Sequence, residues 1–192
     1  PDGQVLVAGG GVGTQSTTEP QLYGIVRRCD LFDPASTAWR RVADMLQFRE
    51  YHAVTLLVAD GRVVTSGGTN IAFRNPPLSA DIEAYSPPYL FRGVRPRIDN
   101  FSASVLRRGD SLSFDVWPNT RLTKVVLMGT GAHTHWVDAG VMRRLELDVN
   151  QSGARATVML PADRNELPVG HYFVFGMVDD IPSIGRIVRV SR

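Results

Sequence analysis

The chain has 192 residues, of which 43% are hydrophobic, so it is long enough for one or two domains and apolar enough to bury a core. Its 21 Lys and Arg against 19 Asp and Glu leave a net charge of +2, and the basic residues are scattered, so charge gives no reason to expect a nucleic acid or an anionic membrane as partner. No apolar run reaches the roughly 18 residues that predict a membrane-spanning helix, and no basic leader followed by an apolar stretch opens the chain.

The first residues and the single cysteine set two further expectations. Pro1, Asp2 and Gly3 are typical of a turn that leads into a strand, so we expect the chain to begin inside a fold and to be a piece of a longer protein. Cys29 has no second cysteine with which to form an internal disulfide, and it precedes a strand-like run. A buried structural thiol is therefore the favoured interpretation.

Short runs rich in Val, Leu and Ile, separated by Gly and Pro, predict an all-β protein. Two segments of the sequence each occur twice in similar form. Residues 1–10 and 59–68 share an Asp-Gly turn, an apolar strand and a Gly-Gly ending, and residues 30–34 and 83–87 share a strand that ends in an aromatic residue before a Pro turn. A double glycine suits a strand end that needs positive φ or lets another backbone pass closely.

This unit, with Trp39 after the first aromatic residue, resembles a kelch repeat, whose unit is one four-stranded blade of a β-propeller. Residues 1–91 are accordingly predicted to form about two blades of an incomplete propeller, with Phe32 and Trp39 packing between blades. Two blades cannot close a ring, because each buries its faces only against its neighbours. We therefore expect the parent protein or another chain to supply the missing blades.

A proline-rich junction at residues 86–96 separates this part from residues 92–192, where short strand-like runs alternate with turn residues. Seven such runs predict an immunoglobulin-like β-sandwich in which Tyr172 and Phe173 pack. The predicted strands are residues 98–105, 111–116, 124–128, 143–149, 155–160, 171–178 and 185–190.

Candidate functional residues fall in two places. Tyr51 and His52 stand side by side at the entrance of the apolar run 54–58, and His133 and His135 lie in a long loop between two predicted strands. Imidazole and phenolate are competent ligands for a copper-like ion, but consecutive strand residues point to opposite faces, so the Tyr-His pair serves one site only where the backbone is irregular. Taken alone, the Tyr-His pair is better explained by packing and a satisfied hydrogen bond, and the two loop histidines are at least as well explained by one hydrogen-bonded and one exposed side chain.

Taken together, the clusters resemble the galactose oxidase and glyoxal oxidase family of mononuclear radical copper oxidases. The resemblance covers essentially the whole chain and matches the C-terminal portion of those proteins, which join a kelch propeller to an early-set immunoglobulin-like domain. Its marks are Arg-Glu-Tyr-His leading into an apolar strand and an Asp-Gly turn at residues 49–63, Ser-Pro-Pro-Tyr-Leu at 86–90, Gly-Thr-Gly-Ala-His-Thr at 129–134, and the weaker segments 167–172 and 182–183.

The resemblance implies a copper ion held by His52 and His133, with Tyr51 as its axial phenolate and general base. It implies that a hairpin around residues 129–142 carries His133 to the propeller axis, with His133 favoured over His135 as the ligand. The implied reaction oxidises a primary alcohol, an aldehyde or a sugar with molecular oxygen and releases hydrogen peroxide. Family members are commonly secreted or found at the cell surface.

One departure limits this expectation. The family's radical cofactor is a tyrosine cross-linked to a cysteine, and nothing in this chain matches that pair, so the cofactor is expected outside the chain and the chain alone is expected to be inactive. The alternative function is a non-catalytic binding or scaffold module built from kelch blades and an immunoglobulin-like domain, for example one that binds carbohydrate.

Overall fold

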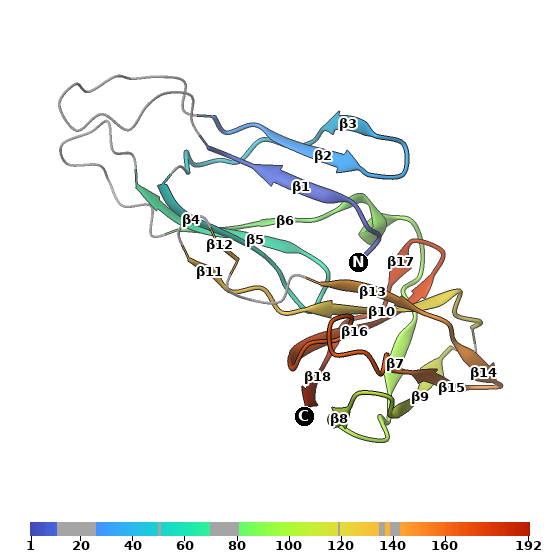
Figure 1. Ribbon diagram of the computed structural model, residues 1–192. Helices are drawn as coiled ribbons and strands as arrows, with labels where there is room; N and C mark the ends of the chain where they lie inside the picture. Colours follow the sequence, from blue (N-terminus) through green and yellow to red (C-terminus); the bar gives the residue numbers. More distant parts are fainter. Residues whose placement is uncertain (11–25, 50, 70–80, 119, 135–136, 139–142) are drawn as a thin grey trace, which may run out of the picture.

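A computed structural model describes residues 1–10, 26–49, 51–69, 81–118, 120–134, 137–138 and 143–192. Within these residues the chain forms β-strands joined by turns, together with a single 3-10 turn, η1 (Pro88–Phe91). The predicted all-β class is confirmed (Figure 1). None of the described residues belong to a helix long and apolar enough to cross a membrane.

The first half of the chain forms two three-stranded antiparallel sheets, drawn in blue and in green to cyan in Figure 1. The first has the order β1-β2-β3 and comprises β1 (Val5–Ala8), β2 (Cys29–Asp33) and β3 (Ala38–Arg41). The second has the order β4-β5-β6 and comprises β4 (Tyr51–Leu57), β5 (Val63–Thr69) and β6 (Ile82–Tyr85).

The sequence repeat is also a repeat of backbone conformation. Gly9 and Gly10 end β1 with φ of 71° and 97°, and Gly67 and Gly68 in β5 have φ of 67° and 94°. By this correspondence β1 is equivalent to β5. Within the described residues β5 lies between β4 and β6, whereas β1 pairs with β2 alone. The assignment of these sheets to propeller blades stays a prediction.

The second half of the chain forms a sandwich of two larger sheets. One has the order β14-β15-β9-β7, with β14 (Asn150–Ser152), β15 (Arg155–Met159), β9 (Ser111–Trp117) and β7 (Arg97–Asp99). The other has the order β13-β10-β16-β18-β8, with β13 (Arg144–Leu147), β10 (Lys124–Gly129), β16 (Gly170–Val178), β18 (Arg186–Ser191) and β8 (Val105–Arg107), and with β17 (Ile181–Pro182) paired to β16. A separate two-stranded hairpin consists of β11 (His133–Thr134) and β12 (Val137–Asp138).

The main core lies between the two sheets of the sandwich. Alternate residues of β9, namely Leu112, Phe114 and Val116, are buried there, because side chains of a strand alternate between its faces. Tyr172 joins the same core and donates its hydroxyl to the Pro168 carbonyl at 2.8 Å. A tyrosine near the start of a strand that bonds back to a backbone a few residues upstream is a known feature of immunoglobulin-like sandwiches.

A second apolar cluster covers the other face of β10 and β16, where the sandwich meets the second three-stranded sheet. Phe173, Phe175 and Met177 lie there against Leu57 and Ala59. Phe173 therefore packs on the outer face of the sandwich, not in its interior as expected. Because β16 is covered on both faces, its residues 172–177 are all buried, and this explains their uninterrupted run of apolar side chains.

The junction between the two halves is held by hydrogen bonds to backbone carbonyls. The Tyr89 hydroxyl donates to the Gly61 carbonyl, in the turn between β4 and β5. The Arg95 guanidinium donates to the carbonyl of Asp60 at 2.6 Å and to those of Pro182 and Ser183 at 2.8 and 2.7 Å. One arginine thus ties a turn of the first half to the end of β17 and the residue after it in the second.

Three expectations need comment. Residues 98–105 are not one strand: β7 and β8 belong to different sheets, and Asn100 between them has a φ of 51°. Cys29 is buried, as predicted, and burial raises the pKa of its thiol. Trp39 contacts Phe32 with ring centroids 4.8 Å apart, yet it is 60% exposed, so packing between blades stays a prediction for this residue.

Candidate metal centre

Tyr51 and His52 open β4, and the backbone there is irregular. Tyr51 pairs with Thr69 of β5 and Ala53 pairs with Gly67, but between these pairs His52 has a φ of 62°. This left-handed conformation interrupts the alternation of a regular strand. The condition under which two consecutive residues can serve one site is therefore met by the backbone. The His52 side chain is exposed, and that of Tyr51 lies outside the described residues.

A glycine on the neighbouring strand makes room for this distortion. A Cβ atom placed on Gly67 would lie 3.0 Å from the carbonyl oxygen of His52, and Gly67 itself has a φ of 67°. A larger residue would meet both a close contact and an unfavourable backbone conformation. The first glycine of the repeated pair is thus required by the approach of the His52 main chain.

Arg49, two residues before Tyr51, stabilises the same strand end through hydrogen bonds of its side chain. Its side chain is wholly buried. Its Nη1 donates to the Gly67 carbonyl at 2.8 Å, and its Nη2 donates to the Asp81 carbonyl at 2.9 Å and to Glu83 Oε1 at 3.2 Å. The Glu83 carboxylate in turn accepts from the Leu46 amide at 2.6 Å. The charge of Arg49 is thereby compensated and the guanidinium is fixed in one orientation.

The main chain of Arg49 reaches the first sheet. Its carbonyl accepts from the Gly10 amide at 2.9 Å, and a Cβ atom placed on Gly9 would lie only 2.7 Å from that carbonyl oxygen. Gly9 and Gly10 of the first pair and Gly67 of the second therefore all lie next to this one arginine. The segment that leads into Tyr51 and His52 is tied to both sheets.

His133 reaches the same region from the sandwich. It lies in β11, which extends beyond β10 and pairs with β12 in the register His133 to Asp138. The base of this extension is anchored where the Gly129 amide donates to the Arg143 carbonyl at 2.8 Å and the Thr130 amide donates to the His171 carbonyl at 3.0 Å. β11 lies against β4, as the neighbouring ribbons in Figure 1 show.

The structure therefore brings two parts of the chain together that are far apart in sequence. The backbones of the Tyr51-His52 pair and of His133 lie on neighbouring elements, although 133 − 52 = 81 positions separate the two histidines. The side chains of Tyr51 and His133, and all of His135, fall outside the described residues. Among the side chains that are described, no group of three His, Cys, Asp or Glu could hold a metal. The ligand set stays a prediction.

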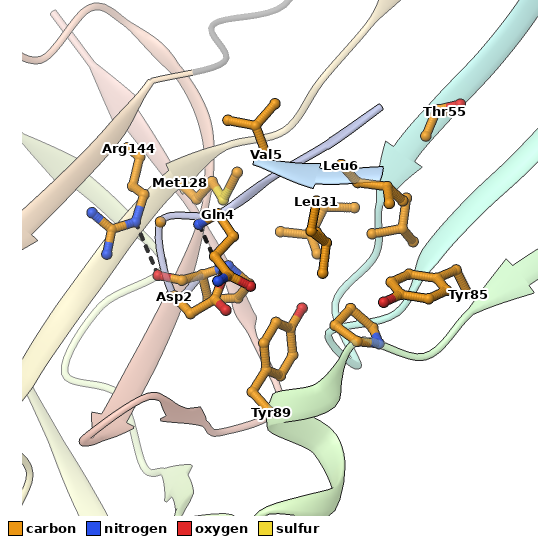
Figure 2. A pocket seen from close by; sticks show the side chains of 15 residues that line it. Asp2, Gln4, Val5, Leu6, Leu31, Thr55, Tyr85, Tyr89, Met128 and Arg144 are labelled. Carbon is orange, nitrogen blue, oxygen red and sulfur yellow. Dashed lines mark hydrogen bonds between the residues drawn. The ribbon is translucent and has the colours of Figure 1, made fainter. Parts of the chain in front are cut away.

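A cavity of about 330 Å³ lies at the opposite end of β4, between the three-stranded sheets and the sandwich. Figure 2 shows Tyr85, Tyr89 and Leu31 around it, with Met128 and Arg144 contributed by the sandwich. Its surroundings are mainly apolar, and Arg144 is already engaged, since its Nε donates to the Pro1 carbonyl at 2.9 Å. The cavity is a gap at the domain junction, separate from the Tyr51-His52 end of the strand.

Comparison with known proteins finds relatives that agree with one another in family. A sequence model described as the galactose oxidase-like early set domain matches residues 95–190. A galactose oxidase of Gibberella zeae is 26% identical over 208 residues, which cover 100% of this chain and 28% of that protein. An aldehyde oxidase of Arabidopsis thaliana is 24% identical, covering 99% of this chain and 34% of that protein.

A solved structure extends the similarity to the three-dimensional fold. A fungal alcohol oxidase of the AA5 family, determined in complex with copper, superposes with a TM-score of 0.85 and 27% sequence identity. The match covers 100% of this chain and 41% of the alcohol oxidase. The early-set immunoglobulin-like fold predicted from the sequence is confirmed. The chain spans about a quarter to two fifths of the length of these relatives.

Sequence reasoning did not single out Arg49, Gly67 and Glu83 as parts of the candidate site. In the sequence, Arg49 was recognised only as part of the Arg-Glu-Tyr-His motif and Gly67 only as part of the repeated Gly-Gly pair, and neither was given a role. One signal was present: a charged residue directly before an apolar strand needs either solvent or a partner. The identity of the partner, Glu83, depends on a strand pairing that the sequence does not state.

Proposed function

Because this chain belongs to the galactose oxidase-like family, we propose that it forms part of a copper-dependent oxidase that converts a primary alcohol or an aldehyde with molecular oxygen and releases hydrogen peroxide. The observation that supports this most directly is the position of β11, which carries His133, against the strand that begins with Tyr51 and His52. Two histidines and a tyrosine from distant parts of the chain are a donor set suited to copper.

In this proposal His52 and His133 provide the two imidazole ligands and Tyr51 provides a phenolate. The residues present fit the ion on two grounds. The donor types match the preference of Cu(II), and the left-handed backbone at His52 removes the obstacle to using consecutive residues of a strand. When bound, copper would polarise the substrate oxygen and accept an electron.

The contribution of the chain itself is proton transfer. As a general base, the Tyr51 phenolate would accept the hydroxyl proton of a primary alcohol, or that of the hydrate which an aldehyde forms with water. The family's cysteine-tyrosine cofactor, which is expected outside this chain, would supply the acceptor for the carbon-bound hydrogen. In total the substrate loses two electrons and two protons, and molecular oxygen gains them to give hydrogen peroxide. By itself the chain is expected to be inactive.

The proposal includes a structural partner. In the repeat β1 is equivalent to β5, which has β4 on one side and β6 on the other, whereas β1 has one neighbour in the described part of the chain. Val5 and Val7 of β1 are about half exposed. Another strand, from elsewhere in the parent protein or from a second chain, would pair with this edge and continue the propeller. A secreted or cell-surface location is expected on the family resemblance alone.

Copper titration of the full-length protein tests the function. The unchanged protein is expected to bind one Cu(II), and His52→Ala and His133→Ala are each expected to lower the affinity by roughly 100-fold or more, since both remove a ligand. His171→Ala is the matched control, because it removes an exposed imidazole from β16 while leaving its backbone contact to Thr130 intact.

Two results would reject the oxidase function. One is the absence of stoichiometric copper in the full-length protein, and the other is an affinity that the His52 and His133 variants leave unchanged. Either would favour the alternative, a non-catalytic module of blades and an immunoglobulin-like domain. If copper binds and depends on both histidines, hydrogen peroxide release from a panel of primary alcohols, aldehydes and sugars would identify the substrate class.

A further inference from the structure

We infer that Arg49 is a positioning residue for the proposed copper site, because its guanidinium fixes the distorted strand end on which Tyr51 and His52 are presented. This inference rests on the proposed function. Arg49 itself would touch neither metal nor substrate. It acts through the Gly67 carbonyl and through the main chain that leads into Tyr51.

The first step of the argument is the unusual environment of the guanidinium. The side chain of Arg49 is completely buried, and that of its ionic partner Glu83 is 17% exposed. A buried cation with no further role is costly, and apolar replacements of buried ion pairs are often tolerated. Two of the acceptors of Arg49 are backbone carbonyls, of Gly67 and Asp81, that lie on either side of the β5–β6 connection.

The second step is a short mechanical path to His52. Arg49 holds the Gly67 carbonyl at 2.8 Å, and the α-carbon of that glycine lies so close to the His52 carbonyl that an added Cβ would be 3.0 Å away. His52 takes its left-handed conformation at this point. If the Gly67 peptide turned away, the backbone at His52 could relax toward an extended strand, and Tyr51 and His52 would then face opposite sides of the sheet.

The third step is that Arg49 also fixes the preceding main chain. Its carbonyl bonds to the Gly10 amide, and Glu83 accepts from the Leu46 amide. The approach to Tyr51 is thereby held from two sheets. Groups that orient metal ligands in this indirect way commonly change metal affinity when they are removed.

The test compares three variants of the full-length protein: Arg49→Met, Gly67→Ala and, as a control, Arg95→Met. Arg95 is also an arginine bonded to backbone carbonyls, but it is only partly buried and lies at the domain junction and not beside His52. Each variant is examined for its Cu(II) dissociation constant by chelator competition, for its Cu(II) electron paramagnetic resonance spectrum and for its melting temperature.

Arg49→Met and Gly67→Ala are each expected to weaken copper binding by about 10- to 100-fold and to alter the copper hyperfine splitting. Arg95→Met is expected to lower the melting temperature while leaving both the dissociation constant and the spectrum unchanged. Agreement between Arg49→Met and Gly67→Ala would show that the effect passes through backbone geometry, because the second variant leaves the charge of Arg49 in place.

The inference alone is overturned if His52→Ala weakens copper binding while Arg49→Met keeps the parent's affinity and spectrum and loses only thermal stability. It is also overturned if Arg95→Met changes the spectrum as much as Arg49→Met, since the effect would then be general destabilisation. A full-length protein without copper binding would reject the proposed function and the inference together. If Arg49→Met does not fold, Arg49→Lys and Gly67→Ala carry the same comparison.

Discussion

Two arginines of this chain stabilise backbone more than they pair with acids. Arg49 and Arg95 between them donate to five backbone carbonyls, three in connections and two in the strands β5 and β17. The planar guanidinium suits this role because it presents several donors in fixed directions, whereas a lysine ammonium does not. A substitution of either arginine by lysine preserves the charge but loses most of the hydrogen bonds, because the ammonium cannot reach the same carbonyls in the same directions.

Tyr89 gives the protein a defined response to alkaline pH. Burial raises the pKa of its phenol above the ordinary value of about 10, while in the unfolded chain the phenol ionises normally. Because the pKa is higher in the folded state, the protonated phenol contributes its full stabilisation of the fold below pH 10. This contribution is lost as the pH rises from 10 toward the pKa of Tyr89 in the folded protein. We expect the free energy of unfolding to fall by about 1 kcal/mol between pH 10 and pH 11 through this residue.

Urea unfolding at a series of pH values, with Tyr89→Phe as the comparison, measures this contribution. The variant retains Tyr85 and Tyr172, whose pKa values burial also raises, so the difference in slope between the two proteins reports Tyr89 alone. Equal slopes above pH 10 would contradict the assignment. Below pH 9 the two proteins are expected to differ by a constant amount, the value of the bond to Gly61.

Among the elements, β16 is the strand on which both halves of the molecule depend. One of its faces contributes Tyr172 and Val174 to the sandwich core, and the other contributes Phe173, Phe175 and Met177 to the contact with the second sheet. Strands covered on both sides lack the alternation of polar and apolar residues. This is why the sequence predicted the strand but not the two surfaces that it faces.

Phe175→Ala is expected to lower the free energy of unfolding by about 3 to 5 kcal/mol, because the ring is completely buried and its removal leaves a cavity at the domain contact. Phe91→Ala removes the same side chain from a position that is 76% exposed and is expected to change stability by less than about 0.5 kcal/mol. Urea unfolding of both variants checks the contrast. Similar losses would mean that the second cluster contributes little.

The strand positions were largely predictable, and the pairings were not. Runs of alternating or continuous apolar residues marked β9, β10, β15, β16 and β18 to within one or two residues. The short polar strand β14 escaped detection because it carries no apolar pattern. Residues 98–105, which include parts of β7 and β8, were predicted as one strand because the composition near Asn100 does not indicate that the chain changes sheets there.

At the scale of the whole molecule, the sandwich is expected to be more resistant to opening than the three-stranded sheets. β10 and β16 are buried on both faces, whereas β1 has exposed Val5 and Val7 and β3 has no buried residue. Local opening follows such differences in burial. Amide hydrogen exchange followed by mass spectrometry should therefore show the slowest exchange in peptides of β10 and β16 and faster exchange in β1 and β3.

Uniform exchange across all of these strands would indicate a single cooperative unit and would contradict this order. Repeating the measurement on the full-length protein adds a second comparison. If a further strand pairs with β1 there, protection of β1 is expected to rise while that of β16 stays unchanged. An unchanged β1 would speak against the proposed continuation of the sheet.

The residues of the candidate site and their convergence were predictable through the family resemblance, whereas the contacts that support them were not. The Tyr51-His52 pair and His133 could be chosen from the sequence through a family resemblance, and the need for an irregular backbone could be stated from strand geometry. The approach of β11 to β4 was expected through the same resemblance, which places His133 on a hairpin directed at the propeller, but strand patterns alone do not give it, because it depends on how the sandwich docks on the sheet. The contact between Arg49 and Glu83 was not predicted either, because it depends on which strands pair.

The positive φ of His52 has a consequence for the evolution of this position. A histidine in that conformation costs roughly 1 to 3 kcal/mol that glycine would largely avoid. A library screened for heat resistance alone is therefore expected to drift toward glycine or asparagine at position 52, whereas a library screened for turnover should retain the imidazole. If His52 is a copper ligand as proposed, selection for activity keeps a residue whose backbone conformation lowers the stability of the sheet.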